Sequence, residues 1–323
     1  MSEWIVTPSA IKERQVDVVV VGGGTSGAIA AVAAARNGAD TMVVEQKGYF
    51  GGIAVEGGTA LHSFYNLWQA FPGQEKRQLI RGIPQELIER LVQVGGCSGH
   101  VPMDLGFNYD SVCTVIDVEI TKYILHQMVE EAGVRQALNT VIVDVQRNGD
   151  RVESILLSSH GHLERVYAKN FIDATGFGDL CALAGAQYTE PNDHSVANSI
   201  GVGGVDVEAY ANFFREKGAL VQYARGVRDG KEGRAIRVQG NFAKASPELA
   251  EEARAIGMAS VITTLHDGYF MFLKLNFKTP ASPADPETLS QAELELRRRQ
   301  QRAVELFRKY IPGCSKAFIA RSS

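Results

Sequence analysis

Apolar residues near the start of the chain follow a strand, turn, helix and strand order. Residues 16–21 form a run rich in β-branched side chains, which is typical of a strand buried on both faces. A glycine-rich turn follows, and the alanine-rich residues 29–36 predict a helix that ends at Asn37-Gly38. Residues 41–45 form a second apolar run. This order within about 30 residues predicts one βαβ unit of a parallel sheet.

The remaining pattern predicts more strands and helices around a region of different character. Residues 190–285 are mixed polar and aromatic, with no βαβ period, and predict a second domain inserted into the first. Ser290 and Glu293 have the spacing of a capping box, which predicts a helix to about Lys309. The other expected elements are a loop over residues 46–66, helices over 79–94 and 118–132, strands over 140–145 and 151–158 joined at Asn148-Gly149, and a strand over 165–175.

Composition narrows the class of protein. The chain has 323 residues, a length that suggests about two domains, and 45% of them are hydrophobic. Its net charge of −4 gives no electrostatic support for binding nucleic acid. None of the four cysteines is spaced as CxxC, which argues against a zinc ribbon, an iron–sulfur cluster or a redox pair. Scattered cysteines and no export signal predict a cytoplasmic protein with reduced thiols.

One stretch has almost the length of a membrane span. Residues 16–35 are nearly all apolar or small, but GGGTSG interrupts them and Asp17 lies near their start. A strand, a tight turn and a helix of small residues explain the stretch better. We therefore expect no membrane association.

The glycine turn carries a dinucleotide-binding pattern. Gly22, Gly24 and Gly27 form GxGxxG, in which the first glycine permits the turn, the second permits approach of a diphosphate and the third permits helix packing. Thr25 and Ser26 complete the turn, where a helix N-terminus offers N–H groups to the diphosphate. Glu45 lies 23 residues after Gly22, near the spacing expected for an acid that binds ribose. The alternative is a packed turn without a ligand, and the motif does not distinguish NAD from FAD.

Three blocks of sequence resemble the FAD-dependent oxidoreductase family, which belongs to the flavoproteins with a two-dinucleotide-fold topology and is related to fumarate reductase flavoproteins. The blocks are VDVVVVGGGTSGAIAAVAAARNGADTMVVEQKGYFGG, FIDATGFGDLCALAGA and LSQAELELRRRQQRAVELFRKYIPGCSKAFIARSS. The resemblance implies FAD as the cofactor. It also implies that further residues contact the cofactor, namely Gly51, Gly52, Val141, Thr175, Gly176 and Asp179. Asp179 is equally well explained as a carboxylate at a helix N-terminus.

The expected fold class is α/β, with a Rossmann-like FAD-binding domain that contains a parallel sheet and a β-hairpin excursion and is interrupted by a mixed α+β substrate or cap domain. The resemblance also implies that the family's chain continues beyond Ser323, so we expect a truncated return segment. The expected boundaries are a leader over 1–15, the FAD-binding domain over 16–189 with an insertion at about 67–112, the substrate or cap domain over 190–285, and a helix returning to the FAD domain over 286–323.

The sequence gives weaker evidence for catalytic residues than for a cofactor site. His62 follows the glycine-rich loop and is the candidate for proton transfer near the flavin. Residues of the second domain that are candidates for proton transfer or for clamping a carboxylate are His194, His266, Arg225, Arg228 and Arg237. The pair His160 and His162 is better explained by a hairpin tip than by a metal site. The run Arg297–Arg299 is better explained by a salt-bridged helix face.

The resulting hypothesis is an FAD-dependent oxidoreductase that transfers hydride between a small organic substrate and flavin. The sequence shows no His/Arg pattern of fumarate reductases, so fumarate is not supported as the substrate. The alternatives are an NAD-linked dehydrogenase built on the same βαβ unit and a non-catalytic remnant that binds a dinucleotide. The expected partners are a small-molecule substrate and, in a homo-oligomer, further copies of the chain.

Overall fold

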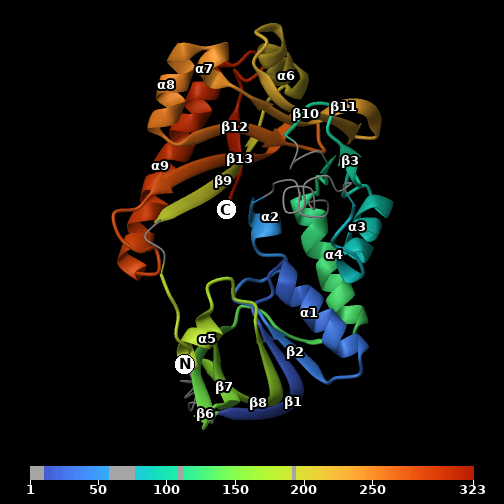
Figure 1. Cartoon of the computed structure of the whole chain (residues 1–323), viewed down its shortest axis with the longest axis vertical. Helices are drawn as coiled ribbons and strands as arrows, with labels where there is room; N and C mark the ends of the chain where they lie inside the picture. The colour runs from blue at the N-terminus through green and yellow to red at the C-terminus, as the bar shows by residue number, and fades with distance from the viewer. Residues whose placement is uncertain (1–10, 58–76, 108–111, 191–193) are drawn as a thin grey trace, which may run out of the picture. The chain divides into compact units, whose positions relative to one another are not determined.

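The computed structural model describes residues 11–57, 77–107, 112–190 and 194–323 (Figure 1). The chain divides into two compact units. The first consists of Met1–Ile53 and Lys122–Thr189, and the second of Ala54–Thr121 and Glu190–Ser323. Each unit has its own sheet, and each is described by itself below.

The first unit is built on a six-stranded sheet in the order β5-β2-β1-β8-β7-β6. Strands β5, β2, β1 and β8 run parallel to their neighbours, whereas β8, β7 and β6 form an antiparallel meander. The strands are β1 (Lys12–Val21), β2 (Thr41–Val44), β5 (Arg135–Ala137), β6 (Val141–Asn148), β7 (Arg151–Ser159) and β8 (His162–Asp173). The helices are α1 (Thr25–Arg36) and α5 (Asp179–Leu183), together with most of α4 (Val118–Glu131).

The apolar pattern of the sequence accounts for the centre of this sheet. Val19 and Val20 of β1 are fully buried, because β1 lies between β2 and β8 and both faces are covered. The predicted βαβ unit is therefore confirmed as β1-α1-β2. Gly149 adopts a φ of +61° between β6 and β7, as the predicted hairpin requires.

The strand begins earlier than the sequence pattern predicts. Lys12 to Val16 already pair with β8, and Arg14 forms an ion pair with Glu164 at 2.7 Å. The prediction of a leader over 1–15 is therefore wrong for residues 12–15. Polar residues continue this strand because pairing with β8, and not burial, holds them.

The second unit contains a six-stranded antiparallel sheet in the order β10-β11-β12-β13-β9-β14. Its strands are β9 (Ser195–Gly203), β10 (Leu220–Arg228), β11 (Lys231–Gly240), β12 (Met258–Thr263), β13 (Tyr269–Lys278) and β14 (Phe318–Ser322). Its main helices are α6 (Val207–Glu216), α7 (Phe242–Ala245), α8 (Pro247–Ala255) and α9 (Pro286–Tyr310). The segment before α4 adds α2 (Ile53–Gly57), α3 (Ile83–Gln93), β3 (Val101–Pro102) and β4 (Val112–Cys113).

Aromatic side chains fill the core between this sheet and its helices. The Tyr210 ring of α6 contacts Phe214 of the same helix, Phe270 of β13 and Phe307 of α9. All four side chains are fully buried. The opposite face carries a smaller cluster that includes Cys113 and Met271. Helices thus cover one face of the second sheet (Figure 1).

Two expectations about the chain after residue 53 are wrong. Residues 286–323 do not return to the first unit, because α9 packs on the second sheet and β14 pairs with β9. The segment Ala54–Thr121 also clusters with the second unit and is no insertion within the first. The helix starts before the predicted capping box, since the Asp285 carboxylate accepts the Thr288 N–H and Ser290 lies inside α9.

Residues 16–35, which have nearly the length of a membrane span, form β1, the glycine turn and α1. No helix within the described residues is long and apolar enough to cross a membrane.

Candidate cofactor site

The glycine turn between β1 and α1 leaves open space at one glycine and none at two others. A Cβ at Gly22, which has a φ of +97°, would lie 2.3 Å from the Ala174 carbonyl oxygen. A Cβ at Gly27 would lie 1.8 Å from the Gly22 carbonyl oxygen. A Cβ at Gly24 would meet nothing within 4 Å, and the next residues, Thr25 and exposed Ser26, begin α1. The space beside Gly24 at a helix N-terminus fits a diphosphate.

A second pair of glycines lies against this turn. The Gly51 N–H donates to the Gly23 carbonyl at 3.0 Å, and Thr25 Oγ1 donates to the Gly51 carbonyl at 2.8 Å. A Cβ at Gly52 would lie 3.0 Å from the Gly24 Cα. The structure therefore brings Gly51 and Gly52 next to the turn. Their contact with the cofactor stays a prediction.

Glu45 is buried at the end of β2, with 7% of its surface exposed. Its Oε2 accepts the Gly23 N–H and its Oε1 accepts the Lys47 N–H, both at 2.7 Å. The carboxylate thus holds the glycine turn, a role that the sequence pattern did not predict. Each carboxylate oxygen can accept two hydrogen bonds, so the group retains capacity for ribose hydroxyls.

A backbone hydrogen bond connects the residue before Val141 to Glu45. The Thr140 N–H donates to the Glu45 carbonyl at 3.0 Å, and Val141 follows directly as the first residue of β6. Its side chain is 44% exposed. The start of β6 thus lies beside Glu45, and the contact of Val141 with adenine stays a prediction.

A hydrogen-bonded turn follows β8, on the other side of β1. Thr175 Oγ1 donates to Asp173 Oδ1 at 2.8 Å and accepts the N–H groups of Gly178 and Asp179, both at 2.9 Å. Asp173 also accepts the N–H groups of Thr175 and Cys181. Burial acts to raise the pKa of Asp173, but these hydrogen bonds outweigh burial and lower the pKa. The sequence analysis missed Asp173, for which an acid at the end of a buried strand was the available signal.

Gly176 and Asp179 belong to this same turn. Gly176 has a φ of +85°, a conformation that favours glycine, and space for a Cβ is open there. Asp179 is the first residue of α5, and burial, followed by repulsion from Asp173, raises the pKa of its carboxyl group. The structure thus places Asp179 at a helix start and at the edge of the site, and both predicted roles remain open.

The candidates for catalysis that the structure describes all belong to the second unit. His62 lies outside the described residues. The backbone carbonyl of His194 accepts hydrogen bonds from Thr279. Arg225 forms an ion pair with Asp104 at 3.0 Å.

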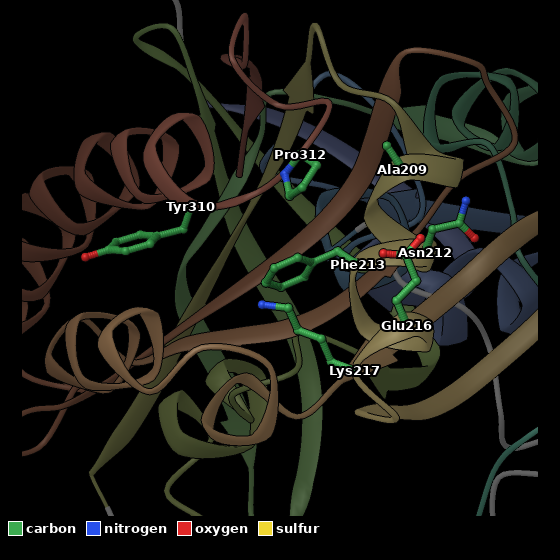
Figure 2. Close-up of a pocket in the computed structure, with 7 residues that line it drawn as sticks. All are labelled: Ala209, Asn212, Phe213, Glu216, Lys217, Tyr310 and Pro312. Atoms are coloured by element: carbon green, nitrogen blue, oxygen red, sulfur yellow. The ribbon is translucent and has the colours of Figure 1, made fainter.

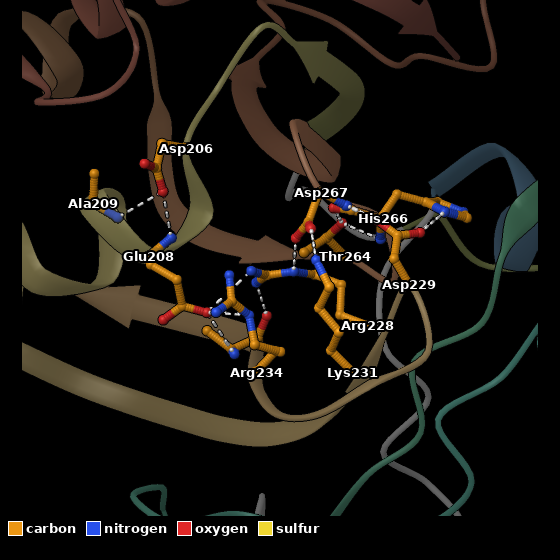
Figure 3. A network of polar contacts seen from close by, with 11 residues as sticks. Asp206, Glu208, Ala209, Arg228, Asp229, Lys231, Arg234, Thr264, His266 and Asp267 are labelled. Carbon is orange, nitrogen blue, oxygen red and sulfur yellow. Dashed lines mark hydrogen bonds and ion pairs between the residues drawn. The ribbon is translucent and has the colours of Figure 1, made fainter.

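Two buried arginines of the second sheet have structural partners. Arg228 is 2% exposed and donates to Asp267, Glu208 and the Ala235 carbonyl (Figure 3). Arg237 is 5% exposed and its Nη2 donates to the Gln222 Oε1 at 2.8 Å. Arg228 is therefore no longer a candidate for clamping a substrate carboxylate, because carboxylates of the chain already occupy its guanidinium group.

His266 joins two parts of the second unit. Its Nε2 lies 2.5 Å from Asp117 Oδ2. Its Nδ1 lies 3.4 Å from Asp229 Oδ1 (Figure 3). The hydrogen bond with Asp117 is the main cause that raises the pKa of His266. Asp117 also accepts the N–H groups of Glu119 and Ile120 at the start of α4. We call this arrangement of His266, Asp117 and Asp229 the histidine clasp, and the sequence analysis missed both aspartates.

Other candidate positions have simple explanations. His160 has a φ of +46° and lies with His162 at the tip between β7 and β8. Arg297, Arg298 and Arg299 form ion pairs with Glu293 and Glu295 along α9, as the charge pattern predicts. The described residues contain no cluster of three or more metal-ligating side chains. Their four cysteines are free thiols, three of them buried.

An open hollow of about 510 Å³ lies in the second unit, between α6 and the end of α9 (Figure 2). Its lining residues are Ala209, Asn212, Phe213, Glu216, Lys217, Tyr310 and Pro312. The Lys217 ammonium lies over the Phe213 ring and donates to the Ala245 carbonyl. All of these lining residues belong to the second unit, and none belongs to the glycine turn.

Comparison with known proteins decides the family. A sequence profile of the FAD dependent oxidoreductase family matches residues 17–323. The chain belongs to this family. FAD is the cofactor of the family, and this membership favours FAD over NAD for the site around Gly24. No curated protein sequence matches the chain.

Solved structures with the same fold come from several kinds of flavoprotein. A geranylgeranyl bacteriochlorophyll reductase-like protein from Thermoplasma acidophilum matches with a TM-score of 0.52 and 16% identity, covering 96% of this chain and 65% of that one. The p-nitrophenol 4-monooxygenase from Pseudomonas putida matches with a TM-score of 0.51 and 11% identity, covering 97% and 68%. A myxobacterial chondrochloren halogenase matches with a TM-score of 0.53 and 12% identity, covering 96% and 61%. The chain thus spans about two thirds of the length of these proteins, and the likeness establishes the fold alone.

Proposed function

We propose that this protein binds FAD at the carboxyl ends of β2, β1 and β8 and transfers hydride between a small organic substrate and the flavin. The observation that carries the proposal is the open position at Gly24. A Cβ there meets nothing within 4 Å, whereas Gly22 and Gly27 are packed against backbone. Space confined to the middle glycine, at the start of α1, is what a bound diphosphate requires.

Residues around this space have the chemistry to hold each part of FAD. The N–H groups of Thr25 and Ser26 at the start of α1 would bind the diphosphate. Glu45 would accept hydrogen bonds from the ribose of the adenosine half, and the backbone at Val141 would pass its adenine. Gly51 and Gly52 would allow the backbone to approach the flavin half. Thr175, Gly176 and Asp179 would border the site beyond β8.

FAD supplies the capacity to accept or release two electrons as hydride, so the chain itself needs to orient, shield and protonate. Glu45 fixes the glycine turn through the Gly23 N–H, which preorganises the diphosphate position before binding. His62 is proposed as the group that moves a proton during hydride transfer. Its position in the sequence, five residues after the end of α2 (Ile53–Gly57) and ten residues after Gly52, motivates this role.

The absorbance spectrum of the purified protein tests the proposal. We expect the two visible bands of an oxidised flavin and release of FAD on denaturation. Released NAD, or a colourless protein that FAD does not convert to a yellow complex, would contradict it. Anaerobic bleaching of the bound flavin by candidate reduced organic compounds then separates an enzyme from a non-catalytic flavin-binding protein.

A further inference from the structure

Phe177 is the most exposed large apolar side chain within the described residues, at 88% of its surface. A phenylalanine normally contributes to stability by leaving water, and this one does not. It lies between Gly176 and Gly178, whose φ angles are +85° and +79°. The backbone on either side therefore adopts a conformation that directs the chain through a tight turn.

Hydrogen bonds hold this turn in place, so the exposure of Phe177 does not result from a loose loop. Thr175 Oγ1 accepts the N–H groups of Gly178 and Asp179, which closes the turn around Phe177. Asp173 fixes Thr175 through its N–H and its hydroxyl. A hydrogen-bonded turn that holds an aromatic ring in solvent presents this ring to a ligand without a further cost of ordering the turn.

The order of strands indicates which part of FAD reaches this turn. Strands β2, β1 and β8 are neighbours, and they end at Val44, Val21 and Asp173 respectively. Glu45 directly follows β2, and Gly22 directly follows β1. With the ribose at Glu45 and the diphosphate at the glycine turn, the rest of the cofactor extends towards β8. A Cβ at Gly22 would lie only 2.3 Å from the Ala174 carbonyl oxygen. The turn that carries Phe177 therefore begins next to the glycine turn, where the diphosphate is proposed to bind.

A second exposed apolar side chain lies at the glycine pair. Ile53, 84% exposed, follows Gly51 and Gly52, and the Gly51 N–H is bonded to the Gly23 carbonyl. Ile53 and Phe177 thus belong to the two segments that adjoin the glycine turn. The isoalloxazine ring is the large, flat and largely apolar part of FAD, so its chemistry matches such a pair.

We propose that the Phe177 ring packs against the isoalloxazine end of bound FAD, with Ile53 as a second apolar contact. This inference rests on the proposed function. Aromatic packing of this kind removes apolar surface of both ring and side chain from water and orders the flavin end of the cofactor. Phe177 is then a positioning residue for the flavin half, whereas Glu45 and Gly24 serve the adenosine diphosphate half.

Two ligands and three variants separate the two halves of the site. We would measure the Kd of apoprotein for FAD and for ADP, which lacks the flavin, in wild type, Phe177→Ala, Phe177→Trp and Tyr188→Ala. Tyr188 is the matched control, since it is also an exposed aromatic residue of the first unit, at 78%. For Phe177→Ala we expect the Kd for FAD to rise by on the order of tenfold. We expect an unchanged Kd for ADP and an altered visible circular dichroism of the flavin. Tyr188→Ala should match wild type, and Phe177→Trp should restore FAD binding.

The outcomes distinguish this inference from the proposed function. Wild-type protein that binds no FAD contradicts the proposed function and this inference with it. Wild-type protein that binds FAD, together with an unaffected Phe177→Ala, contradicts this inference alone. Equal weakening of FAD and ADP in Phe177→Ala also contradicts it, because the side chain would then act through the fold of the turn.

Discussion

At the residue scale, the same substitution has opposite consequences at two glycines of one turn. A side chain at Gly24 enters open space, so Gly24→Val should leave the protein folded and occupy the space of the diphosphate. A side chain at Gly27 collides with the Gly22 carbonyl at 1.8 Å, so Gly27→Val should lower the free energy of unfolding by about 1–3 kcal/mol or more. Far-ultraviolet circular dichroism, urea unfolding and flavin content measure both effects. Full flavin occupancy in Gly24→Val would show that the diphosphate does not bind beside Gly24.

Glu45 is expected to serve the fold and the cofactor together. Glu45→Gln keeps the shape but removes the charge, and its amide nitrogen cannot accept the N–H of Gly23 or Lys47. We expect the ribose to lose one hydrogen bond to a charged group in this variant. Such a loss costs about 1.5–3 kcal/mol, so the Kd for FAD should rise roughly ten- to hundredfold. Titration of apoprotein with FAD measures this change.

The control for Glu45 lies at the other end of β2. Asp40→Asn, just before β2, removes a carboxylate that pairs with Arg135 at the exposed opposite end of that strand. It should leave FAD affinity unchanged. An equal loss in both variants would show that a general change in charge, and not the ribose contact, weakens binding.

At the element scale, helix caps decide where the helices of the second unit begin. The Asp206 carboxylate accepts the N–H groups of Glu208 and Ala209 at the start of α6, which contributes Tyr210 and Phe214 to the core. Asp206→Ala should lower the free energy of unfolding by about 0.5–2 kcal/mol, whereas Asp206→Asn should retain most of it. Urea unfolding followed by circular dichroism measures the difference. Equal stability of the alanine variant and wild type would refute a role of this cap.

At the scale of the whole molecule, the histidine clasp predicts a pH dependence of stability. In the folded protein the pKa of His266 is raised above its ordinary value of about 6.5, chiefly by the hydrogen bond to Asp117. Its contribution is fully present below that value and is lost as the pH rises through the raised pKa. The pKa of Asp117 is lowered, because its hydrogen bonds outweigh burial. Its contribution is therefore lost as the pH falls below about 3.9 and through the lowered pKa.

Removal of the imidazole should therefore matter more in mild acid than in base. We expect His266→Ala to lower the urea midpoint at about pH 5.5 and to have a smaller effect at about pH 9. The groups that face His266 are Asp117, Asp229 and the Tyr269 ring. His194→Ala is the control, because the carbonyl of His194 and not its ring makes the hydrogen bonds described above. A loss of stability in His266→Ala that is the same at both pH values would contradict an ion pair.

Local sequence was sufficient for the features that depend on neighbours along the chain. The β-branched run of β1, the GxGxxG turn, α1 and the hairpin at Gly149 were all predictable, because period, turn residues and chain spacing specify them. Local signals did not determine the start of α9, because the sequence contains two possible helix starts there. Asp285 followed by Pro286 starts α9 one turn before the capping box at Ser290, since an N-cap with proline at N1 also begins a helix well.

Only the tertiary structure decided which distant segments meet. The hydrophobic stripe of α9 would suit either sheet, and burial of Leu296, Val304 and Phe307 placed it on the second one. His266 and Asp117 are 149 residues apart, so no local pattern relates them. Glu45 was recognised from its spacing, but its bond to the Gly23 N–H follows from the parallel pairing of β1 and β2. Local energies thus determine the elements and the motif, whereas burial and strand pairing determine what each side chain contacts.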